Sequence, residues 1–209
     1  MSRPEGAEPL SASFSDRPVE EVARALLGRV LVSRLGGVVT AGRIVETEAY
    51  LGGTDPASHA WNWRRTPSNE ALYSVPGTWY VYRSYGLHWC ANIVTAPTGE
   101  GAAVLLRALE PVAGLDHMRR RRGPVADRAL CAGPGRLCQA LGVSCASDGR
   151  EVVRRARLWV AEGEPPARSR ITASPRIGIT RAVELPLRYV EAGTRWASRP
   201  PSRMAAATV

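Results

Sequence analysis

The order of apolar and polar residues predicts an α+β fold, in which flanking helices cover a curved, mainly antiparallel sheet in a single compact domain. Strand patterns follow one another along the chain instead of alternating with helices as in βαβ units. The length of 209 residues suits one domain with a sizeable core. A hydrophobic content of 44% is also ordinary for a globular protein.

The first predicted elements are a helix and a hairpin. Asp16 can cap the helix and Pro18 fits its first turn, while apolar residues at helical spacing lead to Gly28, which suits the C-terminal cap. Residues 29–35 then have a strand pattern, and two consecutive glycines allow a tight turn into a second strand over residues 38–50.

The middle of the chain adds a loop, a second hairpin and two helices. Residues 52–69 contain many turn-forming residues, and a loop of that length in a compact domain is usually functional. A tyrosine-rich hairpin over residues 77–92 precedes an apolar strand over 102–109. Helices are predicted over residues 112–122 and 134–142. Weaker strand signals lie near Leu158, Ile171, Ile177 and Leu187.

The two ends of the chain differ from the rest in composition. Residues 1–14 and 199–209 are rich in small, polar and proline residues, which favours disordered tails. We therefore assign the folded domain to residues 15–198.

The charge of the chain narrows the kinds of partner it can have. Basic residues number 28 against 19 acidic ones, which gives a net charge of +9 and favours a polyanionic partner, either nucleic acid or an anionic membrane surface. The sequence contains no apolar run long enough to span a bilayer, and residues 1–15 lack the apolar core of a signal peptide. We therefore expect a cytoplasmic protein.

Every basic residue is an arginine, and biased genomic composition is one explanation. Whatever the cause, the chain has no lysine to form a Schiff base with a carbonyl, so lysine-based covalent catalysis is excluded. The four cysteines lack the spacing of common zinc sites. We expect buried or half-buried thiols, no disulfide, no structural metal and no cofactor.

The strand before the long loop carries the chemistry of most interest. Glu46, Glu48 and Tyr50 alternate along it and therefore share one face. Arg107 stands alone in an apolar strand, where an arginine is rarely buried without an anionic partner. If the two strands meet, Arg107 can hold Glu48 ionised and orient a water molecule beside it. The alternatives are a surface carboxylate, or Glu46 in the same role.

Aromatic residues form a second candidate group. Tyr50, His59 and Tyr82 can stack on a planar ring, although tyrosines are more often core residues and a lone histidine more often structural. Tyr85 lies at the turn of the tyrosine hairpin, where it is either an ordinary surface residue or a wedge that enters a nucleic-acid groove.

Several sequence motifs follow one another over residues 20–198. They are Glu46–Gly52 with its spacing to His59; Pro76–Thr78, Tyr80–Tyr82, Tyr85-Gly86 and Asn92-Ile93; Val104–Pro111; Cys131, Gly133-Pro134 and Leu137–Leu141; and Arg176–Ile179. In this order the motifs closely resemble the alkyladenine (3-methyladenine) DNA glycosylase family. The resemblance implies one mixed domain with a β-hairpin that protrudes toward DNA.

The resemblance also implies roles for individual residues. Glu48 matches the general base, while Arg107 and the backbone carbonyl of Ile177 match positions that hold the nucleophilic water. The residues that match the pocket for an extruded base are Tyr50, His59, Tyr82 and Asn92, the last opposing the exocyclic amine of normal guanine. The residues that match the DNA wedge and its flanks are Tyr85, Leu87 and His88.

The resemblance implies a monofunctional DNA N-glycosylase that removes alkylated or deaminated purines and acts by base flipping. Its expected partner is double-stranded DNA with damaged purines; we expect a monomer, no membrane association, and a place near the nucleoid in a bacterium. Two alternatives stay open. One is a non-catalytic nucleic-acid-binding protein with a tyrosine wedge, and the other is a hydrolase of free nucleosides.

Overall fold

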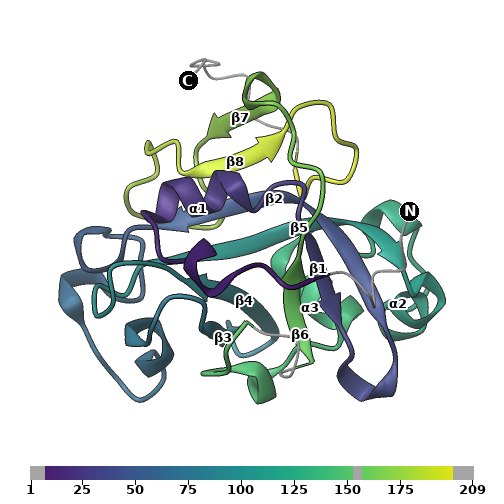
Figure 1. Cartoon of the computed structure of the whole chain (residues 1–209), viewed down its shortest axis with the longest axis horizontal. Helices are drawn as coiled ribbons and strands as arrows, with labels where there is room; N and C mark the ends of the chain where they lie inside the picture. Colours follow the sequence, from purple (N-terminus) through teal and green to yellow (C-terminus); the bar gives the residue numbers. More distant parts are fainter. Residues whose placement is uncertain (1–7, 153–156, 200–209) are drawn as a thin grey trace.

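Eight antiparallel strands form one curved sheet in the computed structural model, which describes residues 8–152 and 157–199 (Figure 1). The strands are β1 (Val30–Ser33), β2 (Thr40–Tyr50), β3 (Trp79–Ser84), β4 (His88–Val94), β5 (Ala103–Ala113), β6 (Leu158–Ala161), β7 (Ile171–Ser174) and β8 (Arg188–Glu191). Their order is β3-β4-β5-β2-β1-β6, and β8 pairs with both β2 and β7. The predicted α+β class and the antiparallel sheet are confirmed.

Three α-helices accompany the sheet in the described part of the chain: α1 (Val19–Ala25), α2 (Leu115–Arg122) and α3 (Pro134–Leu141). Apolar residues of α1 and α3 enter the main core with the inner side chains of β2, β4 and β5. Among the described helices, none is both long and apolar enough to cross a membrane. The helix predicted over residues 134–142 is confirmed: α3 begins at Pro134 and is followed by Gly142, which has a φ of 75°.

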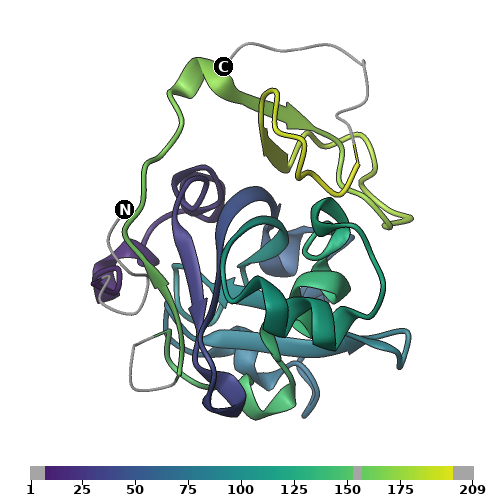
Figure 2. The same ribbon diagram turned by 90° about the vertical axis from the view of Figure 1, so that its right-hand side faces the viewer.

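The β7–β8 pair follows β6 in the chain but joins the sheet at β2. Figure 2 shows the chain rising from β6 through an extended segment, residues 162–167, to this pair. β8 then pairs with the middle of β2, where Glu46 faces Val190 and Glu48 faces Arg188 in the register. A segment near the C-terminus therefore lies directly beside the strand of the candidate catalytic residues.

Two predictions about the first helix need correction. Its first intrahelical bond runs from the Val22 amide to the Pro18 carbonyl at 3.1 Å, so the cap is Pro18 and not Asp16. Gly28 has the expected positive φ of 84°, but it serves a close approach between chain segments. A Cβ at that position would lie 2.1 Å from the Glu164 carbonyl oxygen.

Two further differences concern strands. β5 continues to Ala113, and α2 begins only at Leu115, because Gly114 breaks the strand with φ of 73°. Helix 112–122 was therefore predicted three residues too early. Ile177 lies in an irregular segment and not in a strand, since Pro175 and Gly178, with φ of 80°, interrupt the extended pattern.

The N-terminal segment also differs from its prediction over the described residues. Leu10 donates its amide to the Val160 carbonyl at 2.9 Å, and Pro9 bridges to Ala161, so this segment runs beside β6. Leu10 and Phe14 pack against the main core, which explains why these residues are ordered. The predicted tails over residues 1–7 and 200–209 lie outside the described residues.

Three of the four cysteines have the predicted buried environment, and the prediction is wrong for Cys145. Cys90, Cys131 and Cys138 are buried, Cys145 is exposed, and all four are free. Within residues 8–152 and 157–199, no cluster of three or more histidine, cysteine or acidic side chains has the arrangement of a metal site.

Candidate active site

The candidate catalytic residues meet where β2 pairs with β5. The register matches Glu46 with Ala108 but Thr47 with Leu106, which leaves Arg107 as an extra residue on β5. Such a β-bulge bends the strand and redirects a side chain, and bulges are common beside active sites. The two strands therefore meet as predicted, and a bulge lies at the arginine itself.

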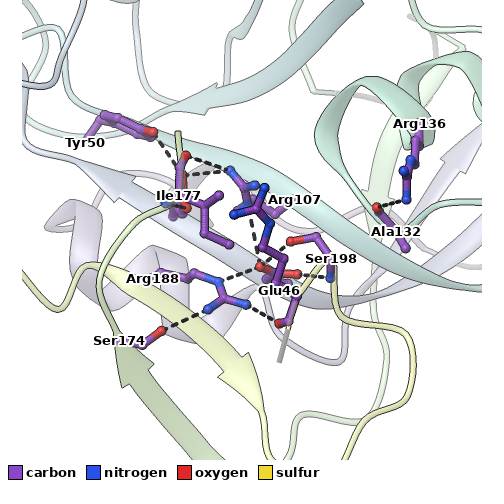
Figure 3. A network of polar contacts seen from close by, with 11 residues as sticks. Glu46, Tyr50, Arg107, Ala132, Arg136, Ser174, Ile177, Arg188 and Ser198 are labelled. Atoms are coloured by element: carbon purple, nitrogen blue, oxygen red, sulfur yellow. Dashed lines mark hydrogen bonds and ion pairs between the residues drawn. The ribbon is translucent and has the colours of Figure 1, made fainter. Parts of the chain in front are cut away.

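Glu48 is fully buried and receives hydrogen bonds from three elements of the fold. Its Oε1 accepts from the Ile177 amide at 2.8 Å. Its Oε2 accepts from the Tyr50 hydroxyl at 2.9 Å and from Arg107 at 3.2 Å. Figure 3 shows Tyr50, Ile177 and Arg107 converging from separate segments. The Ile177 carbonyl also accepts a long bond of 3.4 Å from Arg107.

The environment changes the acidity of this carboxyl group. Burial raises the pKa of Glu48, while Arg107, the Ile177 amide and the Tyr50 hydroxyl lower it, and the neighbouring Glu46 raises it further. The net direction is upward, so Glu48 accepts a proton more readily than an exposed glutamate. Burial and the charge of Glu48 also raise the pKa of Tyr50, whose hydroxyl therefore stays a donor.

A large cavity opens above this carboxylate. Its volume is about 1110 Å³, which exceeds the usual range for small-ligand sites. The predicted residues that line it are Tyr50, His59, Tyr82, Tyr85, Asn92, Arg107 and Ile177. Glu48 is not exposed to the cavity itself and lies beneath Tyr50, Arg107 and Ile177.

An aromatic cluster forms one wall of the cavity. The rings of His59 and Tyr82 lie edge to face with centroids 4.4 Å apart, and Tyr80 stacks on Tyr82 at 5.3 Å. The Nδ1 atom of His59 lies 2.7 Å from the Tyr80 hydroxyl. Burial and the charge of Arg64 lower the pKa of His59, which keeps the ring neutral. Tyr80 was missed as a site residue, although it shares a strand face with Tyr82.

Asn92 is fixed in the same wall. It is buried on β4 and its side-chain amide donates to the Tyr80 carbonyl at 3.0 Å. A side chain held in this way presents a fixed bulk to anything that enters the cavity.

Tyr50 rests on a buried ion pair that sequence reasoning did not find. The guanidinium of Arg176 lies 4.6 Å from the centre of the Tyr50 ring. Arg176 also forms a two-point pair with Asp55 and donates to the Ala49 carbonyl at 3.0 Å. This pair fixes the Tyr50 ring and joins the irregular segment before Ile177 to the loop that follows β2.

The candidate DNA-contact residues lie at the tip of the β3–β4 hairpin, which projects from the body in Figure 2. Tyr85 has a positive φ of 49°, which is uncommon for a tyrosine, and its side chain is 89% exposed. Leu87 is 71% exposed and His88 is also exposed. The hairpin therefore places an uncovered ring beside the mouth of the cavity.

The arginine clusters are partly used inside the protein. Arg119 pairs with Asp127 at 2.7 Å, and Arg121 donates to a carbonyl of α3 at 2.9 Å. Arg65 pairs with Glu70, whereas Arg64 lines the cavity. Most of a third cluster, residues 154–157, lies outside the described residues.

Comparison with known proteins gives a consistent assignment. The family model described as methylpurine-DNA glycosylase (MPG) matches residues 13–195. A putative 3-methyladenine DNA glycosylase of Rhodopseudomonas palustris is 48% identical over 91% of each chain. A similarly named protein of Granulibacter bethesdensis is 50% identical over 86% of this chain and 82% of the relative. The human DNA-3-methyladenine glycosylase is 43% identical over 90% of this chain and 67% of its own length. The chain belongs to the methylpurine-DNA glycosylase family.

Proposed function

We propose that this protein hydrolyses the N-glycosidic bond of alkylated or deaminated purines in double-stranded DNA, with Glu48 as the general base. The substrate class includes 3-methyladenine, 7-methylguanine, hypoxanthine and ethenoadenine. The observation that supports it best is a buried carboxylate of raised pKa directly beneath a cavity lined by aromatic rings. A perturbed carboxyl group in such a place favours acid–base catalysis.

In the proposed mechanism the damaged nucleotide leaves the duplex and enters the cavity. Tyr50, His59 and Tyr82 line the pocket for its base, and two or more of them stack on it; base–aromatic stacking contributes roughly 1–3 kcal/mol per base. Asn92, held by the Tyr80 carbonyl, opposes the exocyclic amine of normal guanine. The charged base 7-methylguanine carries the same amine but is released because its glycosidic bond is labile. Selectivity then arises from the shape of the cavity and from the lability of the damaged base.

Glu48 then takes a proton from a water molecule whose oxygen attacks C1′ of the sugar. The electron pair of the C1′–N bond leaves with the base. A cationic methylpurine departs as the neutral base, whereas a neutral purine such as hypoxanthine takes up a proton from solvent as it departs, so the products are a free purine and an abasic site. Arg107 and the Ile177 carbonyl orient the water. Because the carboxylate is fully covered, the mechanism includes a small displacement of Ile177, whose segment lies outside the sheet.

Tyr85 fills the gap that the flipped nucleotide leaves in the duplex, and Leu87 and His88 flank it. Unstacking a base step costs a few kcal/mol, and an inserted ring offsets part of this cost. The exposed tip of the hairpin supports this role. We further propose that the enzyme acts as a monomer, close to the nucleoid when the cell is bacterial.

Without lysine the only amine of the chain is its N-terminal one, and in this proposal Glu48 activates water instead, so the enzyme is monofunctional. An enzyme that also cuts the strand attacks the sugar with an amine and forms a Schiff base. We expect an intact strand with an abasic site, and no covalent protein–DNA adduct when borohydride is present. Spontaneous nicking together with a trapped adduct would contradict the water-based mechanism.

One assay separates the proposal from its alternatives. Purified protein is incubated with methylated duplex DNA and, separately, with free methylated nucleosides, and released bases are quantified by chromatography. Release from duplex alone is the expected result. Binding without release would favour a non-catalytic DNA-binding protein, and release from free nucleosides would favour a nucleoside hydrolase.

A further inference from the structure

A second buried carboxylate, Glu46, lies on the same strand face as Glu48 but has different partners. Its Oε1 accepts from Arg188 at 2.6 Å and from the Ser198 hydroxyl at 2.8 Å. Its Oε2 accepts from the Ser198 amide at 2.6 Å. Glu46 is fully buried and does not line the cavity, so it is not placed to meet a substrate.

Glu46 also contacts the arginine of the catalytic group. The Nε atom of Arg107 lies 3.4 Å from Glu46 Oε1 and, within the described residues, has no hydrogen bond of good geometry. The opposite end of the same guanidinium donates to Glu48 at 3.2 Å. Figure 3 shows Glu46 between Arg107 and Arg188. The carboxylate of Glu46 is thus the group that holds the Nε edge of the Arg107 guanidinium.

The anchors of Glu46 come from the C-terminal part of the domain. Arg188 begins β8, donates to Ser174 of β7 at 3.2 Å, and also donates to the Arg199 carbonyl at 2.6 Å. Ser198 lies beyond β8 and contributes two donors to one carboxylate. A charged hydrogen bond in a buried site is stronger than a neutral one, so this arrangement fixes Glu46 firmly.

We infer that Glu46, anchored by Arg188 and Ser198, is a positioning residue that aims Arg107 at Glu48. The segment from Arg188 to Ser198 is then part of the catalytic apparatus, although it does not line the cavity. The inference rests on the proposed function, in which Glu48 must be ionised to act as a base.

The rate of base release falls at low pH as Glu48 takes up a proton, and this fall is the acidic limb of the pH–rate profile. The pH at which the limb lies distinguishes positioning of Arg107 by Glu46 from a simple effect of the Glu46 charge. The ionisable groups that act on Glu48 or feel its charge are Arg107, Glu46, Tyr50, Tyr82, Cys90 and Arg176. Arg107 lowers the pKa of Glu48 more than Glu46 raises it. If Arg107 stays in place without Glu46, the pKa of Glu48 falls. If Arg107 moves away, the pKa rises and the limb moves to higher pH.

The experiment compares Glu46→Gln and Glu46→Asp with the wild type. The aspartate keeps the charge but shortens the reach, so it isolates positioning. Single-turnover release of 7-methylguanine from a duplex is measured against pH and corrected for enzyme-free release. This base already carries a positive charge and needs no proton to leave, so the acidic limb reports on the enzyme. The matched control is Glu191→Gln, which removes a carboxylate from β8 that pairs with Arg43 of β2.

We expect both Glu46 variants to release base roughly 10²-fold more slowly, as small misplacements of catalytic groups do, with the acidic limb shifted to higher pH. Ser198→Ala should shift it in the same direction by less, and Glu191→Gln should leave it unchanged. A limb that moves to lower pH in Glu46→Gln, or is unmoved in Glu46→Asp and Ser198→Ala, would overturn the inference. Slower release with an unmoved limb indicates a structural role only.

The same assay separates failure of this inference from failure of the proposed function. If the wild type releases no base, or Glu48→Gln still does, the proposed function is wrong. If the wild type and Glu48→Gln behave as proposed but the acidic limb does not move to higher pH in the Glu46 and Ser198 variants, only the positioning role is wrong. If Glu46→Gln does not fold, Glu46→Asp and Ser198→Ala still decide the question.

Discussion

Two buried carboxylates, Glu48 and Asp55, lie seven residues apart and each meets an arginine, yet their pKa values shift in opposite directions. The pKa of Glu48 is raised, chiefly by burial. Burial also acts to raise the pKa of Asp55, but hydrogen bonds and charge from Arg176, with backbone amides, outweigh it and lower the pKa. The Glu48–Arg107 pair therefore has the character of a reactive group, and the Asp55–Arg176 pair that of a structural contact.

The number of donors explains the difference. Asp55 accepts from two backbone amides, at 3.0 and 3.1 Å, and from both ends of the Arg176 guanidinium. These four bonds fill the acceptor sites of a carboxylate. Glu48 accepts only three, so its Oε1 keeps capacity for a water proton. Asp55 thus stabilises the fold, whereas Glu48 keeps a free acceptor site beneath the cavity.

The largest expected effect on stability is at Asp55. Asp55→Asn leaves Arg176 without its buried partner, and breaking a buried ion pair costs about 3–5 kcal/mol. The free energy of unfolding is measured by urea denaturation. The control is Asp116→Asn, which removes a surface carboxylate that is 78% exposed and pairs with Arg119. Equal losses in the two variants would contradict a structural role for the Asp55 pair.

A smaller effect is expected at Tyr85, whose exposed ring is also available to a substrate. Tyr85→Ser should weaken binding of lesion-containing duplex by about 1–3 kcal/mol, because a stacked ring is lost. Excision from single-stranded DNA should suffer less, since no gap needs filling. Val75→Ser, at another exposed apolar residue, is the control for lost surface area. Equal losses on both substrates would indicate a plain surface tyrosine.

The smallest effect is a gain in stability at Glu48. A carboxyl group whose pKa is raised by folding destabilises the folded state when it is ionised, above its folded pKa. Glu48→Gln should therefore raise the melting temperature at neutral pH, and the gain should shrink as the pH falls and the wild-type Glu48 takes up its proton. A variant less stable than the wild type at neutral pH would place Glu48 with Asp55 as a structural carboxylate.

How much the sequence could predict differs between these regions. A lone arginine in an apolar strand indicated the partnership of Arg107 with Glu48. The same rule applied to Arg188, between Leu187 and Tyr189, would have indicated the partner of Glu46. The Asp55–Arg176 pair joins two loops 121 positions apart, for which a single sequence carries no signal.

The antiparallel sheet, the hairpin and the α3 boundaries followed from alternation, tyrosine content and the flanking proline and glycine. The bulge at Arg107 did not, because strand register depends on packing against the neighbouring strand. A weak strand was predicted near Ile177, but the amide of Ile177 donates to Glu48 and not to a neighbouring strand. Local sequence patterns thus predicted the strands and helices, whereas contacts between residues distant in the sequence complete the site.

The most direct test of the difference between the two carboxylates is single-turnover excision of 7-methylguanine from duplex DNA by Glu48→Gln. The amide keeps the shape of the side chain and removes its ability to take a proton. We predict that duplex binding stays close to that of the wild type while base release falls by about 10²–10⁴-fold, the usual contribution of a general base. Release at a rate near that of the wild type would contradict the assignment of Glu48 as the group that activates water.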